Sequence, residues 1–199
     1  MIHPDTEVRF ISPEKGYGVV ASKFIPKGTI TWVQDDLDQI FKRDQISCMT
    51  PLIKQFLTKY SFRNKNGDYV LCWDNAKFVN HSFTPSCFST SYDFEIAIRD
   101  IHPGEELTDD YGYLNVEEPF TCIDENVFRK TVYPDDLLRF HKEWDALLLE
   151  QSQEVLKKDQ ILLDFIPTKT WGEFMNAVYN PTQMRSILEC YYEESSIHK

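Results

Sequence analysis

Hydrophobic and polar residues alternate over short distances in the first 120 residues of the chain. Short runs rich in β-branched and aromatic residues are separated by turn-forming proline and glycine, a pattern that predicts β-strands. The expected strands are Glu7–Ile11, Tyr17–Ile25, Thr29–Val33, Tyr69–Trp73 and Phe94–Ile101. One helix interrupts them, because Thr50-Pro51 is a typical cap and first helical residue, and apolar residues then recur at helical spacing as far as Tyr60.

Beyond Pro134 the spacing of apolar residues becomes helical. The expected helices run from Pro134 to about Lys158, from Trp171 to Tyr179 and from Asn180 to about Tyr192. Early acidic residues favour the first helix, and the Asn-Pro pair at 180–181 favours the start of the third. We therefore divide the chain into a mainly β domain, residues 1–120, and a helical C-terminal extension, residues 121–199. The polar face of the extension is solvated or provides a homodimer surface.

The balance of charge limits the classes of partner. The 199 residues include 21 Lys and Arg against 32 Asp and Glu, a formal charge of −11. A general nucleic-acid binder needs concentrated positive charge for phosphate contacts, so this balance favours a basic partner instead, although solubility alone also explains it. No apolar run approaches the roughly 20 residues that span a bilayer, and the N-terminus lacks the pattern of a signal peptide. We expect a soluble, cytoplasmic protein that binds neither nucleic acid directly nor a membrane.

Three segments concentrate residues capable of chemistry. Gly16-Tyr17-Gly18 lies between a turn and a strand, a context that excludes a dinucleotide loop but allows either a simple turn or close approach of the backbone to a ligand. In the second segment, Asn80-His81-Ser82 directly follows an apolar pair, and buried polar groups of this kind need partners in a turn or in a site. The third segment, residues 104–113, is rich in carboxylates but lacks the alternating ligands of a Ca²⁺ loop.

His81 allows two other interpretations. With Cys87 it could form the base and nucleophile of a thiol enzyme, and with Cys72 and Cys87 it could form a metal site. Both are disfavoured, because catalytic pairs usually meet from distant positions in the sequence and the paired spacing of structural zinc ligands is absent. Five cysteines without a CxxC pair are more simply interpreted as reduced thiols.

In their order and spacing, the three segments together resemble the SET-domain protein-lysine methyltransferases. That family has a GxG near its start, then an (R)(F)(I/V)NHS(C)xPN(C) segment, then GEELTxDYG. The corresponding segments here are Gly16–Gly18, Lys77–Cys87 and Gly104–Gly112. The similarity extends over residues 7–122, and the short chain without accessory domains is most similar to bacterial or viral members.

The resemblance implies a mainly β fold and a cofactor. The fold would consist of small antiparallel sheets with a knot-like crossing of the segments that contain Asn80 and Tyr111, followed here by a C-terminal α-helical appendage. The implied cofactor is S-adenosylmethionine, with S-adenosylhomocysteine as the product. The residues that match its binding positions are Gly16, Tyr17, Gly18, Asn80, His81, Tyr111 and Phe120.

The resemblance also implies a catalytic role for Tyr111, with Tyr69 lining the lysine channel. A lysine amine has an ordinary pKa of about 10.4 and must lose its proton before it attacks a methyl group; desolvation and a nearby sulfonium both lower that pKa. Tyr113 and Asp109 are expected to line the same substrate channel. The substrate's positive charges are expected at the acidic run beside Tyr111, which consists of Glu105, Glu106, Asp109 and Asp110.

Several positions depart from the family pattern. Phe83 and Ser86 replace the usual Cys and Asn of the second motif, and Asp109 replaces the Phe or Tyr that often controls how many methyl groups are added. Phe120-Thr121-Cys122 is similar to the start of the family's zinc-binding tail, but the later cysteines are missing, so no zinc is expected. The predicted function is transfer of a methyl group to a lysine of a basic protein, histone-like or ribosomal. The alternative is a catalytically inactive SET-like interaction module.

Overall fold

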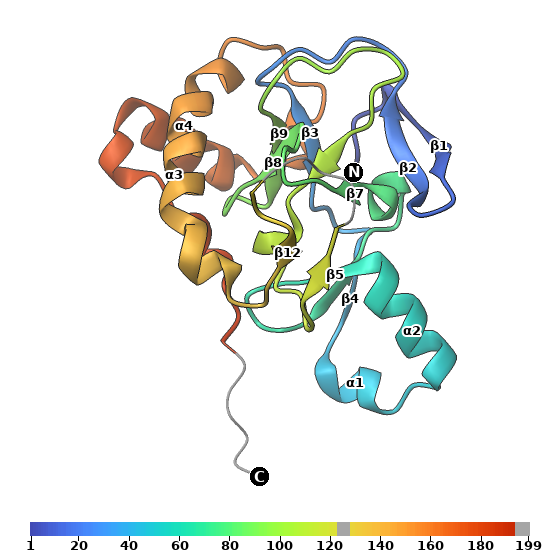
Figure 1. The fold of residues 1–199 in the computed structure, drawn as a ribbon. Helices are drawn as coiled ribbons and strands as arrows, with labels where there is room; N and C mark the ends of the chain where they lie inside the picture. The colour runs from blue at the N-terminus through green and yellow to red at the C-terminus, as the bar shows by residue number, and fades with distance from the viewer. Residues whose placement is uncertain (123–127, 194–199) are drawn as a thin grey trace.

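The computed structural model describes residues 1–122 and 128–193, and its strands form five small sheets (Figure 1). The strands are β1 (Thr6–Ser12), β2 (Gly16–Ala21), β3 (Ile30–Val33), β4 (Gln39–Phe41), β5 (Ser61–Arg63), β6 (Tyr69–Leu71), β7 (Asn80–His81), β8 (Cys87–Ser89), β9 (Phe94–Ala97), β10 (Thr108–Asp109), β11 (Phe120–Thr121) and β12 (Thr131–Val132). Four sheets are antiparallel: β1-β2, β3-β9-β8, β4-β6-β5 and β11-β12. The fifth pairs β7 with β10 in parallel, and it brings two segments together that are far apart in the sequence.

Two helices lie between β4 and β5 and two follow the last strand. They are α1 (Arg43–Ser47), α2 (Pro51–Tyr60), α3 (Asp136–Val155) and α4 (Thr168–Tyr179). Short 3₁₀ helices cover η1 (Asn75–Phe78), η2 (Tyr111–Tyr113), η3 (Leu163–Phe165), η4 (Pro181–Gln183) and η5 (Ile187–Cys190). The predicted helices of α2, α3 and α4 are confirmed, whereas α1 is a single turn, too short for a periodic pattern to reveal it. Among the described helices, none is long and apolar enough to cross a membrane.

The helix predicted from Asn180 to Tyr192 is wrong. The chain forms only η4 and η5 there, because its backbone N–H groups find partners in other elements. The N–H of Arg185 donates to the hydroxyl of Tyr92 at 3.1 Å, and the N–H of Ile187 donates to the Asp145 carboxylate in α3 at 2.7 Å. These tertiary bonds replace the local bonds that a continuous helix would need.

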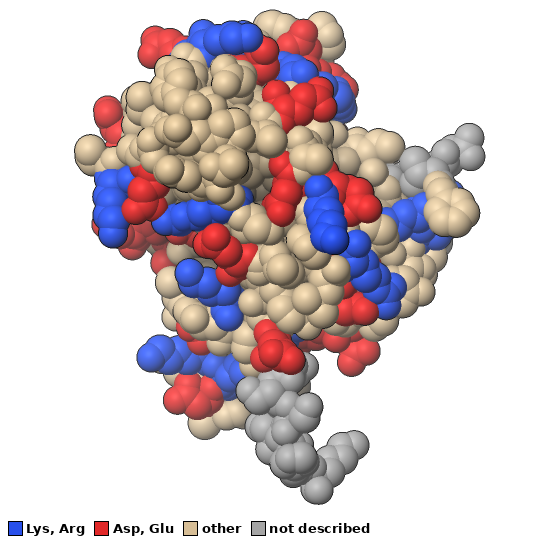
Figure 2. Space-filling model, turned by 90° about the vertical axis from the view of Figure 1, so that its left-hand side faces the viewer, with Lys and Arg blue, Asp and Glu red and all other residues tan. Residues whose placement is uncertain are grey.

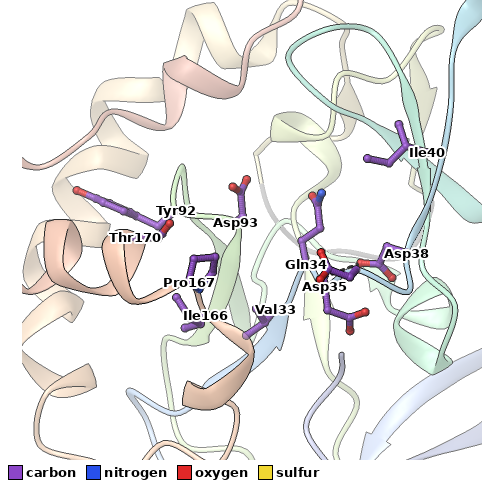
Figure 3. A pocket seen from close by; sticks show the side chains of 11 residues that line it. Val33, Gln34, Asp35, Asp38, Ile40, Tyr92, Asp93, Ile166, Pro167 and Thr170 are labelled. Atoms are coloured by element: carbon purple, nitrogen blue, oxygen red, sulfur yellow. Dashed lines mark hydrogen bonds between the residues drawn. The ribbon is translucent and has the colours of Figure 1, made fainter.

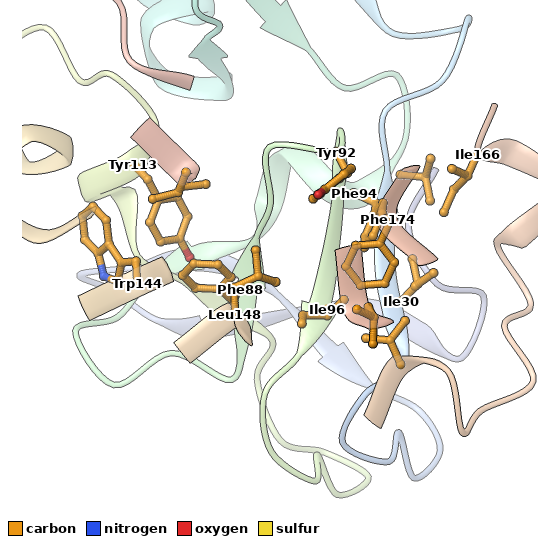
Figure 4. Packing of buried hydrophobic residues seen from close by; sticks show 14 of the residues in the cluster. Ile30, Phe88, Tyr92, Phe94, Ile96, Tyr113, Trp144, Leu148, Ile166 and Phe174 are labelled. Carbon is orange, nitrogen blue, oxygen red and sulfur yellow. The ribbon is translucent and has the colours of Figure 1, made fainter. Parts of the chain in front are cut away.

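The C-terminal helices and the β3-β9-β8 sheet share one hydrophobic core (Figure 4). Phe174 of α4 lies edge-on to Phe94 of β9, with ring centroids 5.1 Å apart. Trp144 and Leu148 of α3 belong to the same buried cluster as Phe88 of β8. The C-terminal helices therefore complete the core of the sheet, and the division into a domain and a helical appendage stays a prediction.

The small sheets and the C-terminal helices agree with the predicted mainly β fold class. The predicted knot-like crossing stays a prediction, since what the structure establishes is the parallel pairing of β7 with β10. Figure 2 shows the face of the molecule that α3 and α4 form, with a broad uncharged area bordered by mixed charges. Leu138, Leu149 and Tyr179 are exposed apolar side chains of these helices, and the homodimer expected through them remains a prediction.

Candidate active site

The parallel pair of β7 and β10 brings the second and third motifs together. Asn80 lies opposite Thr108, and His81 lies opposite Asp109. The N–H of Ser82 continues the pairing by donating to the carbonyl of Asp109 at 2.9 Å. Asp109 pairs with His81, and the turn η2 begins two residues later at Tyr111. The pairing therefore places His81 beside this turn.

Tyr111 is fixed at both its backbone and its side chain. Its N–H donates to Nδ1 of His81 at 3.1 Å, and its hydroxyl donates to the carbonyl oxygen of Val79 at 2.6 Å. Burial, followed by the nearby Asp109 carboxylate, raises the pKa of the Tyr111 phenol well above its ordinary value. The hydroxyl is thus a neutral, oriented group.

His81 presents a buried nitrogen without a partner. Because Nδ1 accepts the bond from Tyr111, the proton of the neutral ring is on Nε2, and this atom has no hydrogen-bond partner among the described residues. Burial, then the positive charge of Arg129, lowers the pKa of His81 to about 4. The rings of Phe83, Tyr111 and Phe120 lie at centroid distances of 4.3, 5.4 and 5.3 Å from the imidazole. The imidazole is therefore an uncharged donor inside an aromatic cluster.

The first motif lies against Asn80. The Asn80 amide donates to the carbonyl of Tyr17 at 3.1 Å and to Oε1 of Glu106 at 2.7 Å. A Cβ on Gly18 would lie 2.5 Å from Oε1 of Glu106 and 2.8 Å from the Asn80 amide, so a larger residue here would displace these two groups. Gly16 has a φ of 78°, which places it in the left-handed region that favours glycine. The side chain of Tyr17 is 58% exposed, so the motif meets Asn80 through its backbone.

Tyr113 and Asp109 are both buried in the core. Their exposed fractions are 2% and 4%, and the Tyr113 hydroxyl donates to the Asp109 carboxylate. The Tyr113 ring lies edge-on to Trp144 with centroids 5.1 Å apart. Burial, then the Glu95 carboxylate, raises the pKa of Asp109 well above its ordinary value. The expectation that these two residues line the substrate channel stays a prediction.

Tyr69 lies in β6. It is 8% exposed, and its hydroxyl donates to a carboxylate oxygen of Glu117. Burial, then that hydrogen bond, raises the pKa of Tyr69 well above its ordinary value. The Arg63 guanidinium lies 3.6 Å from the same carboxylate, so Tyr69 belongs to a small polar network with a partly exposed acid.

The four carboxylates of the acidic run differ in exposure, and the substrate's positive charges expected beside them remain a prediction. Asp110 is 4% exposed, and its carboxylate pairs with Arg129. Glu105 pairs with Arg99, and Glu106 lies 3.3 Å from Lys15 while it accepts from Asn80. Asp110 and Glu106 thus contact other site residues, whereas Glu105 makes an exposed pair. The sequence did not reveal these partners, because the burial of the carboxylates cannot be read from it.

A separate cavity of about 280 Å³ lies between the loop after β3 and the start of α4 (Figure 3). Carboxylates of Asp35, Asp38 and Asp93 and apolar groups of Ile166 and Pro167 contribute to its wall. None of the predicted site residues lines this cavity, so it is distinct from the cluster around Tyr111. In the described parts of the chain, no three His, Cys, Asp or Glu side chains gather as metal ligands.

The family model of the SET domain matches residues 16–112. These residues contain all three motifs and the β7-β10 pair, so residues 16–112 are a SET domain, as the motifs predicted. The SET domain is a methyltransferase-type fold, and its members are in general S-adenosylmethionine-dependent lysine methyltransferases. A search of the curated proteins found no match to the chain.

Proposed function

We propose that this chain is a protein-lysine N-methyltransferase that uses S-adenosylmethionine. The observation that carries the proposal is the cluster in which Tyr111 is bonded to both His81 and Val79, directly beside the unpartnered Nε2 of His81. A turn with a purely structural role would have paired that buried nitrogen, because an unsatisfied buried donor is costly.

The residues around this cluster fit the proposed cofactor. Nε2 of His81 is a buried donor that has no acceptor among the described residues, and the aromatic rings around it suit the flat apolar faces of an adenine. The absent side chain at Gly18 keeps backbone accessible beside Asn80. The residues that would hold the cofactor are Gly16, Tyr17, Gly18, Asn80, His81 and Phe120. When bound, S-adenosylmethionine supplies a methyl group on a positively charged sulfur, which a neutral amine can accept.

Tyr111 would orient the substrate amine. The Tyr111 hydroxyl donates its hydrogen bond to the Val79 carbonyl, so the lone pairs of the phenol oxygen are left to accept a hydrogen bond from a lysine nitrogen. Burial keeps the phenol neutral and disfavours a charged lysine in the same place, which lowers the pKa of the incoming amine. Positioning of a neutral amine is then the main contribution of the protein.

The proposed substrate is a basic, lysine-containing protein, histone-like or ribosomal. The formal charge of −11 supports this part of the proposal, because an acidic protein attracts basic partners over long distances. Tyr69 remains the proposed second tyrosine of the lysine channel, and its bond to Glu117 places a partly exposed carboxylate beside it.

Transfer of a radiolabelled methyl group from S-adenosylmethionine to histones or ribosomal proteins tests the proposal. We expect transfer by the full chain and a loss of about a hundredfold or more in Tyr111→Phe, while calorimetry still detects cofactor binding. Tyr179→Phe is the matched control, because Tyr179 is 69% exposed on α4. Full activity of Tyr111→Phe would contradict the catalytic assignment. A wild-type chain that binds no cofactor would instead favour the inactive interaction module.

A further inference from the structure

Arg129 joins two buried carboxylates that belong to different parts of the fold. Its guanidinium donates to Asp110 in the third motif and to Asp136 at the start of α3. The side chains of these two acids are 5% and 0% exposed, and that of Arg129 is 19% exposed. Two carboxylates so far from water need a counter-charge, and a planar guanidinium with several donors can serve both at once.

The same guanidinium is enclosed by aromatic rings. It lies 4.7 Å from the ring centroid of Phe83, 4.9 Å from Phe140 and 5.7 Å from Trp144. Cations are attracted to ring faces at such distances, so the rings add to the ion pairs. A Cβ on Gly112 would lie only 2.3 Å from Nη2 of Arg129, so the glycine of the third motif leaves the space that the guanidinium fills.

These contacts link Arg129 to the rings around His81. Phe83, one of the three aromatic partners of Arg129, packs edge-on against the imidazole of His81. Arg129 also lies two residues before β12, which pairs with β11, where Phe120 lies opposite Val132. Phe120 in turn packs against His81 and Tyr111, with ring centroids 5.3 and 5.9 Å away.

Asp110 and Asp136 also fix the backbone on both sides of the guanidinium. Asp110 accepts from the N–H of Gly112 at 2.9 Å, which holds the turn that carries Tyr111. Asp136 accepts from the N–H of Tyr133 at 2.9 Å, which holds the connection between β12 and α3. One cation therefore ties the catalytic turn, the β11-β12 pair and α3 together.

We propose that Arg129 is a positioning residue that clamps the β11-β12 pair and the Asp110–Tyr113 turn around the nucleoside side of the cofactor site. The inference rests on the proposed function for the identity of the ligand, and on the contacts of Arg129 for the clamp itself. Loss of the clamp frees Phe120 and Phe83 from their places beside His81 and weakens binding of an adenosine-containing ligand.

Calorimetric titration of the full chain with S-adenosylhomocysteine tests the effect on binding. We expect Arg129→Gln to bind at least tenfold more weakly than wild type, and Arg129→Lys to fall between them, because lysine keeps the charge but loses the planar fork. Arg139→Gln is the matched control. Arg139 lies in α3, pairs with Asp135 at 2.7 Å and lies over the ring of Tyr133, but its side chain is 47% exposed. Its loss leaves affinity unchanged.

Nuclear magnetic resonance of the ligand-free protein tests the clamp without reference to the cofactor. We expect the ring-proton shifts of His81 to move toward those of an exposed histidine in Arg129→Gln, because Phe83 and Phe120 leave the imidazole. In Arg139→Gln the ring-proton shifts of His81 keep their wild-type values. The charged groups that face the His81 ring are Arg129, Asp110 at 3.9 Å and Lys15 at longer range. The spectra are therefore compared at pH 7.5, well above the pKa of His81.

The two measurements separate the clamp from the proposed function. A wild-type chain that does not bind S-adenosylhomocysteine contradicts the proposed function, whereas the His81 shifts still decide whether the clamp exists. Wild-type affinity and unchanged His81 shifts in Arg129→Gln overturn the clamp. If Arg129→Gln does not fold, Arg129→Lys decides, since wild-type affinity and shifts in that variant overturn the clamp equally.

Discussion

His81 shows how burial and charge act on a single side chain of the site. Its side chain is 5% exposed, accepts a hydrogen bond from the Tyr111 backbone through Nδ1 and lies near the Arg129 guanidinium. Desolvation and the neighbouring cation both disfavour a second positive charge, which is why its pKa is lowered to about 4. The neutral ring can therefore donate from Nε2 throughout the physiological range of pH.

The lowered pKa of His81 predicts how this residue affects stability with pH. Between pH 6.5 and about 4, His81 is protonated in the unfolded chain but not in the folded chain. The contribution of His81 to the free energy of unfolding is therefore complete above pH 6.5 and is lost as the pH falls through this window. The full effect is about 3 kcal/mol. Urea unfolding of wild type and His81→Asn should give a difference in unfolding free energy that grows from pH 4 to pH 7. A difference that is constant over this range would contradict the assignment.

Single residues of the site were predictable where a motif defined them. Asn80, His81 and Tyr111 were found from their motifs, and the structure brings them together. Arg129 was missed, because its role depends on two carboxylates whose burial is not visible in the sequence. Glu106 was interpreted as part of an acidic surface, whereas it accepts from Asn80, and only the packing of β7 near the first motif reveals this contact.

Among the elements, the β7-β10 pair contains only two residues on each side, and the Ser86 side chain adds hydrogen bonds that support it. Ser86 is fully buried, and its hydroxyl accepts from the N–H of Thr108 at 2.9 Å and donates to the carbonyl of Glu106 at 3.3 Å. Ser86 is one of the departures from the family pattern. Here it connects the segment after β7 with β10, and so it holds the two motifs in register.

Replacement of Ser86 by alanine tests this support. Ser86→Ala leaves the buried N–H of Thr108 without its side-chain partner, and we expect a loss of about 1–3 kcal/mol in unfolding free energy. Ser47→Ala is the control, because the Ser47 hydroxyl makes an exposed bond to the carbonyl of Asp44 in α1, and we expect it to cost under about 0.5 kcal/mol. Guanidinium unfolding measures both. Equal stability of the two variants would show that Ser86 does not support the pair.

Elements differed in how far the sequence revealed them. The helix α2 was predictable because Pro51 marks its start and apolar residues follow at helical spacing. The strands β7 and β10 were not predictable as strands, since two residues show no periodicity and exist as strands only because they pair with each other. The family resemblance predicted that the segments containing these two strands meet in space, whereas the pattern of polar and apolar residues did not indicate this.

On the scale of the whole molecule, the site and the C-terminal helices depend on the same core. Trp144 of α3 packs edge-on against Tyr113, two residues after Tyr111, and also faces the Arg129 guanidinium. Phe174 of α4 packs against Phe94 of β9. The division of the chain at residue 120 stays a prediction, and the pattern of apolar residues could not show that the apolar faces of the two parts bury one another.

The shared core predicts that the two halves unfold together. Phe174 is fully buried, and Phe174→Ala should cost about 3–5 kcal/mol, a large part of the roughly 5–15 kcal/mol by which domains are stable. Tyr179→Ala, at a 69% exposed position of the same helix, serves as the control and should cost under about 1 kcal/mol. Helical circular dichroism and the His81 ring-proton signals should lose their native values at one common denaturant midpoint, shifted down in Phe174→Ala. If the helical signal alone moved while the His81 signals kept the wild-type midpoint, the helices would be a separate unit and the dependence of the site on them would be excluded.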